Sequence, residues 1–428
     1  MFMEKKLLEA NEALKSKKYD EAILIYQEIL KTYDVAEIHF NLGLVLKIQN
    51  KLDAAEASFS KAISLKSDFV LAHYQLGNTR YKLNKFDESE ICYQNAISLK
   101  NNFLEAYINL ARAQRELRKF KEAEDNLRIA KKLNPDFLEV NVLLGLILFD
   151  RGRLSDDLKH RDLNKLNESK MILSKSIKSN PNYAFAHQNL GLVQQELGDL
   201  YDAKVSFEEA LKLEPNSIYA NQNLKILLNQ IKILNELGIS KDKTFNYPDL
   251  LKRFNKIPFI THKEPDSNLI ELLYKINSTE LNKTKGGPLF GNGKTSDYNL
   301  LENNNPILIN LKKELIDIIN KETNSNVLLI DSFFNILGAG GGSVPHHHLN
   351  SFDKTFKLDQ QKFSLTYYLS VGDQNCDEPG IFKIYEPEED VLPSNGMIMI
   401  IPSSRKHSAV YGGTTDRVMI GVNFYLYN

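Results

Sequence analysis

The sequence contains very little cysteine: only Cys92 and Cys376 in 428 residues. Two cysteines this far apart in the chain cannot build a disulfide framework, and they exclude a cysteine-rich zinc or iron–sulfur site. Proteins that rely on disulfides are typical of oxidising compartments. We therefore expect this chain to work in a reducing, cytoplasmic environment.

The sequence also lacks an excess of charge of either sign and any long apolar run. Its 54 Lys and Arg residues against 55 Asp and Glu residues give a formal net charge of −1. This balance predicts no nucleic-acid partner, because such proteins usually carry excess positive charge. The best apolar run, Leu143–Phe149, is far shorter than the ~20 residues of a membrane span. Charges also interrupt the first 20 residues before a signal-peptide core could form, so we expect no membrane partner.

One pattern of residues recurs along the first half of the chain. A short motif, most often ending in Leu-Gly, returns at spacings of 34, 34, 34 and 46 residues, the last being one period plus 12. Its copies begin at Asn41, Gln75, Asn109, Leu143 and Asn189. Four copies are followed at fixed distances by a small residue and then a large apolar one, in the pairs Ala55 and Phe59, Ser89 and Tyr93, Ala123 and Leu127, and Ala203 and Phe207. Such regularity indicates stacked helical units.

This pattern resembles the tetratricopeptide repeat, a 34-residue unit of two antiparallel helices. The resemblance covers residues 4–216 and implies about six units, with an insertion near 151–164. A last amphipathic helix, predicted over Ser217–Leu237, would cap the open end of the solenoid. We therefore expect residues 1–237 to form an all-α superhelix.

In this repeat family the residue before each Leu-Gly or Leu-Ala faces a concave groove. The candidates at this position are Asn41, Gln75, Asn109 and Asn189. A row of side-chain amides can hydrogen-bond the backbone of an extended peptide. The resemblance therefore implies a protein or peptide partner in the groove. The alternative is that these amides are only repeat consensus and bind nothing.

The second half of the chain has a different character. Residues 238–257 are predicted to be a linker, and residues 258–428 a second domain. Helical patterns occur at Asp266–Ile276 and Pro306–Lys321, and the glycine-rich stretch Gly338–Gly342 is expected to be a flexible loop. Short β-branched or aromatic runs predict strands at Val327–Leu337, Phe363–Val371, Ile381–Tyr385, Met397–Ile401 and Val418–Tyr427. Strands of this length and spacing favour a sandwich or a jelly roll.

Three consecutive histidines, His346 to His348, precede one of these predicted strands. Alternate side chains of an extended chain point to the same face, so His346 and His348 would point together and His347 away. His407 follows 59 residues later, and Arg417 opens the last predicted strand ten residues beyond it. We expect a hairpin or a jelly-roll corner to bring His407 and Arg417 to one cavity.

These residues resemble the iron(II)- and 2-oxoglutarate-dependent dioxygenases, in particular the prolyl 4-hydroxylase-like group and a related bacterial and phage branch that uses His-x-His. The resemblance covers residues 325–428 well and implies a double-stranded β-helix, or jelly roll, with flanking helices. It implies that His346, His348 and His407 are the catalytic residues that bind Fe(II). Arg417 would anchor the cosubstrate 2-oxoglutarate, and Tyr368 and Asn335 are further candidates for its pocket.

The sequence departs from this family at one ligand. His348 stands where most members have a carboxylate, and Asp353 could supply the missing acid. Imidazole and oxygen ligands suit Fe(II), although a zinc site is an alternative. The whole chain is therefore expected to be a hydroxylase whose repeats recruit a protein or peptide. The alternatives are an interaction scaffold with an inactive oxygenase-like domain, and an oxygenase that acts on a glycan or small molecule.

Overall fold

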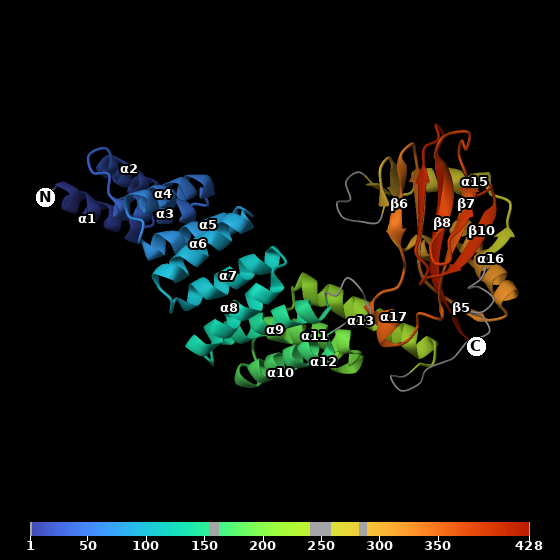
Figure 1. The fold of residues 1–428 in the computed structure, drawn as a ribbon, viewed down its shortest axis with the longest axis horizontal. Helices are drawn as coiled ribbons and strands as arrows, with labels where there is room; N and C mark the ends of the chain where they lie inside the picture. The colour runs from blue at the N-terminus through green and yellow to red at the C-terminus, as the bar shows by residue number, and fades with distance from the viewer. Residues whose placement is uncertain (1, 154–161, 240–257, 282–288, 428) are drawn as a thin grey trace. The chain divides into compact units, whose positions relative to one another are not determined.

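The computed structural model describes residues 2–153, 162–239, 258–281 and 289–427 (Figure 1). The chain divides into two compact units, Met1–Leu224 and Lys225–Asn428. Most of the predicted linker (240–257) and the centre of the predicted insertion (154–161) lie outside the described residues. Among the described helices, none combines the length and the apolar character needed to span a membrane.

The described part of the first unit is built from helices, the last of which continues into the second unit, and the helices from α1 to α12 each pack against the next. The helices are α1 (Phe2–Lys15), α2 (Tyr19–Leu30), α3 (Ala36–Ile48), α4 (Leu52–Leu65), α5 (Val70–Lys82), α6 (Phe86–Leu99), α7 (Leu104–Glu116), α8 (Phe120–Leu133), α9 (Leu138–Arg153), α10 (Leu163–Ser179), α11 (Ala184–Leu197), α12 (Leu200–Leu213) and α13 (Ile218–Glu236). The prediction of an N-terminal all-α superhelix is confirmed. The helix α13 agrees with the expected capping helix to within one residue at each end.

Close packing within each repeat depends on a small residue that faces a large one. A Cβ atom added to Gly43 on α3 would lie 2.7 Å from the ring of Phe59 on α4. Glycines face a large residue in the same way in the pairs Gly77 and Tyr93, Gly145 and Leu173, and Gly191 and Phe207. The repeat formed by α7 and α8 has Ala111 in place of glycine, and its partner is Leu127 rather than an aromatic ring. The extra methyl group is thus matched by a smaller partner.

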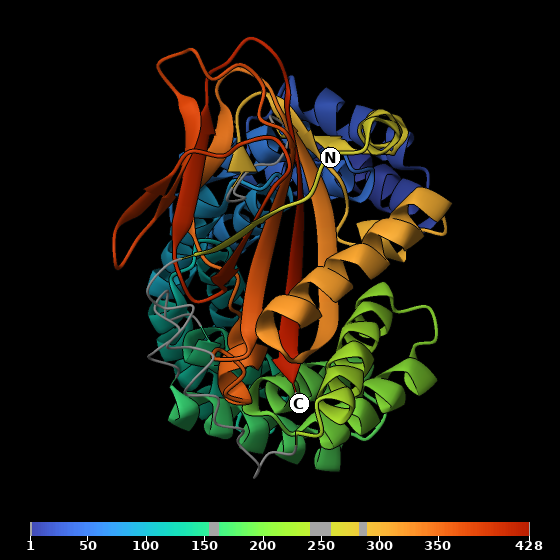
Figure 2. The same ribbon diagram turned by 90° about the vertical axis from the view of Figure 1, so that its right-hand side faces the viewer.

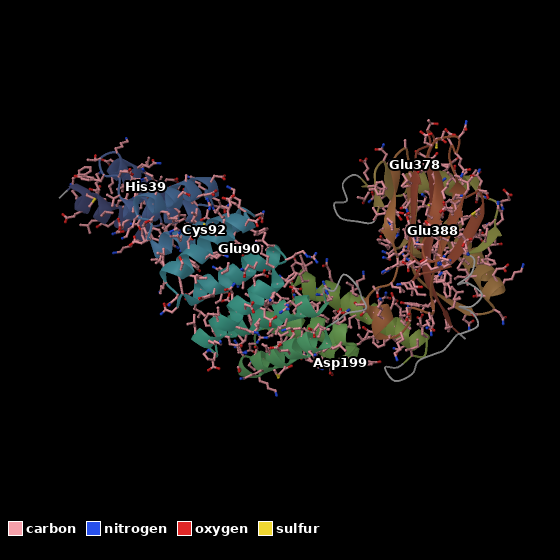
Figure 3. All side chains as sticks on the ribbon, viewed as in Figure 1. His39, Glu90, Cys92, Asp199, Glu378 and Glu388 are labelled. Atoms are coloured by element: carbon pink, nitrogen blue, oxygen red, sulfur yellow. The ribbon has the colours of Figure 1, made fainter. Side chains whose placement is uncertain are left out.

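Buried or partly buried carboxylates recur with the same period and connect neighbouring helices, and one of them, Glu90, is labelled in Figure 3. Glu90 on α6 accepts hydrogen bonds from Gln114 Nε2 at 3.0 Å and Lys119 Nζ at 2.6 Å. Its equivalents one period away are Glu56 and Glu124. Glu124 contacts cations on both sides of the insertion, at Arg151 and Lys165. These ion pairs hold the pKa of the Glu124 carboxyl near 2, against its desolvation by burial.

We predict that Gly43→Ala destabilises α3 and α4, because its methyl group overlaps the Phe59 ring. Overpacking of this kind costs about 1–3 kcal/mol. Hydrogen exchange of the α3 amides in the full chain should report the loss. The double variant Gly43→Ala, Phe59→Leu should recover most of it, since the repeat formed by α7 and α8 uses that combination. Ala54→Ser, on the exposed side of α4, is the control. Equal protection in Gly43→Ala and the parent would contradict this account.

The second unit is rich in antiparallel strands. They are β1 (Phe259–His262), β2 (Thr279–Glu280), β3 (Leu289–Phe290), β4 (Gly293–Thr295), β5 (Asn326–Leu337), β6 (Gly341–His346), β7 (Lys362–Ser370), β8 (Pro379–Ile384), β9 (Glu389–Val391), β10 (Met397–Pro402), β11 (His407–Tyr411) and β12 (Arg417–Tyr427). One sheet has the order β1-β10-β7-β12-β5-β4-β2, and the other has the order β3-β6-β11-β8-β9. The helical elements are α15 (Ser267–Lys275), η3 (Leu300–Glu302), α16 (Pro306–Thr323) and α17 (Ser351–Thr355).

The two predicted helices and five predicted strands of this unit all occur in the structure, which also contains elements that were not predicted. The expected loop at Gly338–Gly342 is a loop only in part, because Gly341 and Gly342 belong to β6 and pair with Tyr411 and Val410. A Cβ atom on Gly342 would lie 2.3 Å from the carbonyl oxygen of Ala409, so the glycines allow close strand approach. The other elements that were not predicted are the helix α17, the short helix η3 and the strands β1, β2, β3, β4, β9 and β11.

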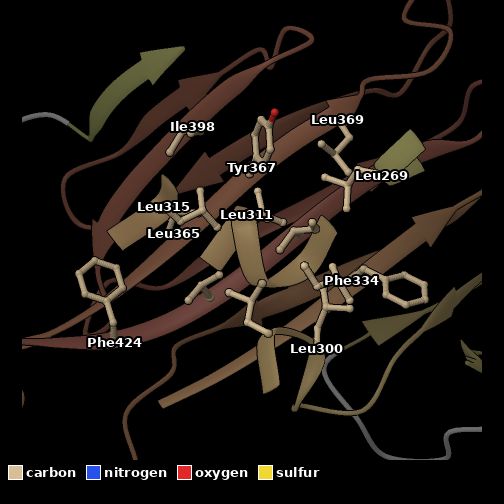
Figure 4. Close-up of a cluster of buried hydrophobic side chains, with 14 of the residues drawn as sticks. Leu269, Leu300, Leu311, Leu315, Phe334, Leu365, Tyr367, Leu369, Ile398 and Phe424 are labelled. Atoms are coloured by element: carbon tan, nitrogen blue, oxygen red, sulfur yellow. The ribbon is translucent and has the colours of Figure 1, made fainter. Parts of the chain in front are cut away.

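The larger sheet has two faces with different environments. On one face α16 packs against the strands (Figure 2). The buried cluster there joins Leu311 and Leu315 of α16 to Phe334, Leu365 and Ile398 of the sheet (Figure 4). Because side chains alternate along a strand, the residues between these apolar ones point to the opposite face. That second face contributes to a cavity, which contains the candidate site.

Candidate metal centre

Three histidines converge where the smaller sheet ends. His346 is the last residue of β6 and His407 the first of β11, and the two are paired directly across the ladder. His348 follows two residues after β6, and its backbone N–H donates to the carbonyl oxygen of Ser403 at 3.0 Å. One ring nitrogen of each of the three histidines lies within 4.8 Å of the others. In the described part of the chain this is the only such group of metal-capable side chains.

The orientation of two rings is set by backbone carbonyl groups. His346 Nδ1 lies 2.8 Å from the Val344 carbonyl oxygen, and His407 Nδ1 lies 3.1 Å from that of Arg405. A histidine that donates from Nδ1 presents the lone pair of Nε2 to the site, which is the arrangement typical of metal ligands. Phe382 stacks on the His407 ring at 5.0 Å. His347 takes no part in the cluster, and its Nδ1 instead accepts from the Leu349 N–H.

The environment keeps the three imidazoles neutral. Burial lowers the pKa of His348 to about 2 and the pKa of His407 to about 4, and neighbouring histidines add to both shifts. Burial also lowers the pKa of His346. Only the neutral imidazole can bind a metal. The Nε2 atoms of His348 and His407 are 3.2 Å apart, so both can lie about 2.1 Å from one ion. The residues therefore fit a divalent transition metal such as Fe(II) or zinc.

The histidines line a cavity of about 270 Å³ between the two sheets, and Arg417 lines the same cavity. The Arg417 side chain is almost fully buried. It donates hydrogen bonds to the carbonyl oxygens of Val371, Pro379 and Gly380. Three of its five N–H donors are thus used. In the described part of the chain no carboxylate forms an ion pair with it. A buried cation of this kind favours an anionic ligand.

The weaker candidates Tyr368 and Asn335 lie in the same cavity. The Arg417 guanidinium is 5.8 Å from the Tyr368 ring centre and 4.7 Å from that of Tyr411. Asn335 is buried, and its Oδ1 has no hydrogen-bond partner among the described residues. The structure thus places all six of the predicted metal and cosubstrate residues around one cavity.

Asp353, the alternative metal ligand, is not part of the histidine cluster, and both of its carboxylate oxygens accept hydrogen bonds from other residues. Its carboxylate accepts from Lys362 Nζ at 2.9 Å, from the Asn350 N–H at 2.8 Å, and from the hydroxyl of Tyr425. It also caps α17 and has no exposed surface. The described part of the chain therefore supplies no carboxylate to the histidine cluster.

The predicted row of groove amides is largely engaged within the protein. Gln75 Oε1 accepts from Lys47 Nζ at 2.7 Å. Asn109 Nδ2 donates to Asn78 Oδ1 at 2.8 Å and to the Tyr74 hydroxyl at 3.1 Å. Asn189 is buried, and its amide donates to the Phe185 carbonyl oxygen of its own helix. Of the four candidates, only the Asn41 side chain forms no hydrogen bond with another described residue.

Sequence reasoning missed several residues of the cavity. Gly380 has a positive φ of 78°, and a Cβ atom there would lie 1.9 Å from Arg417 Nη1, so this glycine makes room for the guanidinium. Ser364 and Asn423 are polar residues inside apolar strands, and both line the cavity. A polar residue within an apolar run is the signal that could have identified these two.

Family models match only the first half of the chain. A model described as a TPR repeat matches residues 43–84. Two models described as tetratricopeptide repeat match residues 70–103 and 184–217, and residues 108–160. The first half therefore carries tetratricopeptide repeats, as predicted. No curated protein matches the chain.

Solved structures that are similar to this chain cover about half of it. One is YrrB, described as a TPR protein with an unusual peptide-binding site. It is 20% identical with a TM-score of 0.39, over 47% of this chain and 97% of that one. Another is MamA from Desulfovibrio magneticus RS-1, which is 17% identical with a TM-score of 0.37, over 44% and 98%. A third is PilF of Pseudomonas aeruginosa, which is 13% identical with a TM-score of 0.42, over 51% and 95%.

We predict that the metal-free protein loses stability as the pH falls below 6.5, the ordinary pKa of the histidines. Folding lowers the pKa of His348 and His407, so the unfolded chain binds their protons more readily. Both histidines contribute to this loss of stability between pH 6.5 and about 4, and His348 alone contributes below pH 4. Each contributes at most about 1.4 kcal/mol per pH unit. Urea unfolding across this range should show a shallower slope for His348→Gln and His407→Gln. His187→Gln, on α11, is the control, and an unchanged slope in the cluster variants would contradict the burial of neutral rings.

Proposed function

We propose that this protein is an Fe(II)- and 2-oxoglutarate-dependent dioxygenase that hydroxylates a C–H bond of a protein or peptide. One observation carries the proposal. Three convergent neutral imidazoles share a cavity with a buried arginine that has no carboxylate partner in the described residues. A three-ligand metal site beside a carboxylate-binding arginine suits an oxoacid as cosubstrate.

The strand order supports this proposal. Apart from β8 and β9, which share a sheet, consecutive strands from β5 to β12 lie in different sheets, in the order β10-β7-β12-β5 in one and β6-β11-β8-β9 in the other. Numbered from β5, these orders are 6-3-8-1 and 2-7-4-5, which supports the proposal of an eight-stranded jelly roll. The helices α15 and α16 would be its flanking helices. His346 and His407 then lie on strands two and seven, His348 follows just after strand two, and Arg417 lies on strand eight.

Each residue of the cavity has a definite role under this proposal. His346, His348 and His407 would hold Fe(II), which when bound supplies the activation of O₂ coupled to conversion of 2-oxoglutarate to succinate and CO₂. Arg417 binds the far carboxylate of the oxoacid with the two N–H groups that the backbone carbonyls leave available. The rings of Tyr368 and Tyr411 pack against the guanidinium and keep water from it.

The repeats support a protein or peptide substrate. Tetratricopeptide repeats typically bind peptides or proteins, and five or more such units present a long surface. Binding by the repeats would raise the local concentration of substrate at the cavity. Because Asn109 and Asn189 are engaged within the protein, groove binding would rest on other side chains or require Asn109 to exchange partners.

We predict that the protein binds one Fe(II) through His346, His348 and His407. Anaerobic titration with Fe(II) and 2-oxoglutarate should give a weak visible charge-transfer band. His407→Ala should abolish the band, because three ligands on one face are the minimum for this geometry. His347→Ala is the matched control, since its ring lies outside the cluster. Equal binding by His407→Ala and the parent would exclude this metal site, and equal loss in His347→Ala would exclude the assignment of ligands.

We predict that Arg417 sets the requirement for 2-oxoglutarate. Arg417→Ala should raise the concentration for half-maximal succinate production roughly 10- to 100-fold, from the loss of about 1.5–3 kcal/mol of charge-assisted bonding. Gly380→Ala should raise it too, because its Cβ atom would displace Nη1. Fe(II) binding without 2-oxoglutarate should survive in both. Lys383→Ala removes an exposed cation of β8 and is the control. An unchanged requirement in Arg417→Ala would remove this residue from the site.

A further inference from the structure

A row of polar side chains crosses the larger sheet on its cavity face, beside the histidine cluster. Asp331 of β5, Asn423 of β12 and Ser364 of β7 occupy neighbouring positions in the ladders. Asn423 Nδ2 donates to Asp331 Oδ1 at 2.7 Å, and Ser364 Oγ donates to Asn423 Oδ1 at 2.7 Å. Ser364 Oγ also lies 2.8 Å from Ser403 Oγ, and the Ser403 carbonyl accepts from the His348 N–H. The row therefore begins at a carboxylate and ends against a metal-ligand candidate.

The charge of Asp331 is not balanced by a cation of its own. No ion pair to Asp331 occurs within the described ranges of the chain. The nearest basic influence is Lys362, whose Nζ is held by Asp353 at 2.9 Å. Asp331, Asp353 and Lys362 together carry one net negative charge. Burial accordingly raises the pKa of the Asp331 carboxyl, against the hydrogen bond from Asn423.

Two aromatic rings lie next to this carboxylate. Tyr298 and Phe333 pack edge to face, with ring centres 5.3 Å apart, and both line the cavity. Tyr298 is 59% exposed, so it marks the open side of the cavity, whereas Arg417 is 1% exposed. The Phe333 ring lies over Gly421 of β12, where a Cβ atom would approach it to 2.4 Å. The charge of Asp331 contributes to raising the pKa of Tyr298, in line with their proximity.

We propose that Asp331, Tyr298 and Phe333 form a subsite for a positively charged group of the substrate, a primary amine or a guanidinium. A carboxylate without a counter-ion attracts such a group, and aromatic faces add cation–π attraction. Arg417 then binds the oxoacid inside the cavity, and Asp331, hydrogen-bonded to the lining residue Asn423, attracts the charged group of the substrate beside it. This inference rests on the proposed function for its meaning, but the binding that it describes does not require catalysis.

The test measures binding to the full-length, metal-free protein, so its result is independent of the proposed reaction. The probes are end-capped, fluorescently labelled peptides that differ at one central residue: Lys, Arg, norleucine or Glu. Norleucine has nearly the shape of lysine without its charge. We expect the Lys and Arg peptides to bind about tenfold or more tightly than the norleucine peptide, which corresponds to about 1.4 kcal/mol. The Glu peptide should bind most weakly. Competition by butylamine and agmatine tests whether a small amine can take the same place.

The variants assign any preference to this subsite. Asp331→Asn should remove the preference for Lys over norleucine, and Asp331→Lys should reverse the order of the Lys and Glu peptides. Tyr298→Leu replaces an exposed ring and should reduce binding of the Lys peptide more than that of the norleucine peptide. Asp377→Asn removes an exposed carboxylate and is the matched control. Circular dichroism checks that each variant is folded.

The outcomes distinguish the proposed subsite from the proposed dioxygenase function. Binding of basic peptides that depends on Asp331, without any succinate production by the iron-loaded protein, would keep the subsite and overturn the proposed function. Binding of free amines alone, dependent on Asp331, would keep the subsite and make its occupant a small molecule. Equal affinity for the Lys and norleucine peptides together with no effect of amines, or an unchanged preference in Asp331→Asn, would overturn the subsite.

Discussion

The alternation of side chains along β12 and its two neighbours is the constraint on which the second unit depends. Val418 and Ile420 point to the helix-covered face, and Arg417, Met419 and Asn423 point to the cavity. A shift of one residue in the pairing of β12 would exchange these two sets. It would place a guanidinium among the leucines of α16 and would remove the charged end of the cavity. The long ladders of β12 with β5 and β7 hold the register in place.

The electrostatics of the site depend on three neutral imidazoles and on two charged groups, Arg417 and Asp331. Three imidazoles without a carboxylate would leave a divalent metal with its whole charge, which an anionic oxoacid can partly offset. Arg417 would then balance the far end of that anion. Beside the cavity, Asp331 has no ion pair among the described residues, and the nearby Lys362 is paired with Asp353. Under our proposals, charge would thus separate the oxoacid at Arg417 from the cationic group of the substrate at Asp331.

The first unit is built on a different principle, local repetition. Each helix contacts mainly the helices next to it in sequence, and the same small-to-large contact recurs within each repeat. Such a structure can vary one repeat without disturbing the others, as the Ala111 and Leu127 pair illustrates. The same freedom explains why the candidate groove residues differ in their hydrogen-bond partners. Asn189 donates to its own helix, whereas Asn109 belongs to a network with the preceding repeat.

The sequence by itself determined the elements whose signals are local. Repeat spacing located the helix pairs, apolar runs located five of the strands, and the order of His346, His348, His407 and Arg417 indicated one shared site. Only the tertiary structure decided which groups are already engaged. Asp353 is hydrogen-bonded to Lys362 and Tyr425, and Gly341 and Gly342 join a strand because Tyr411 and Val410 lie beside them. Asp331 is connected to His348 through a residue of β12, a residue of β7 and Ser403. These contacts join segments up to about 90 residues apart, and no local pattern encodes which of them will meet.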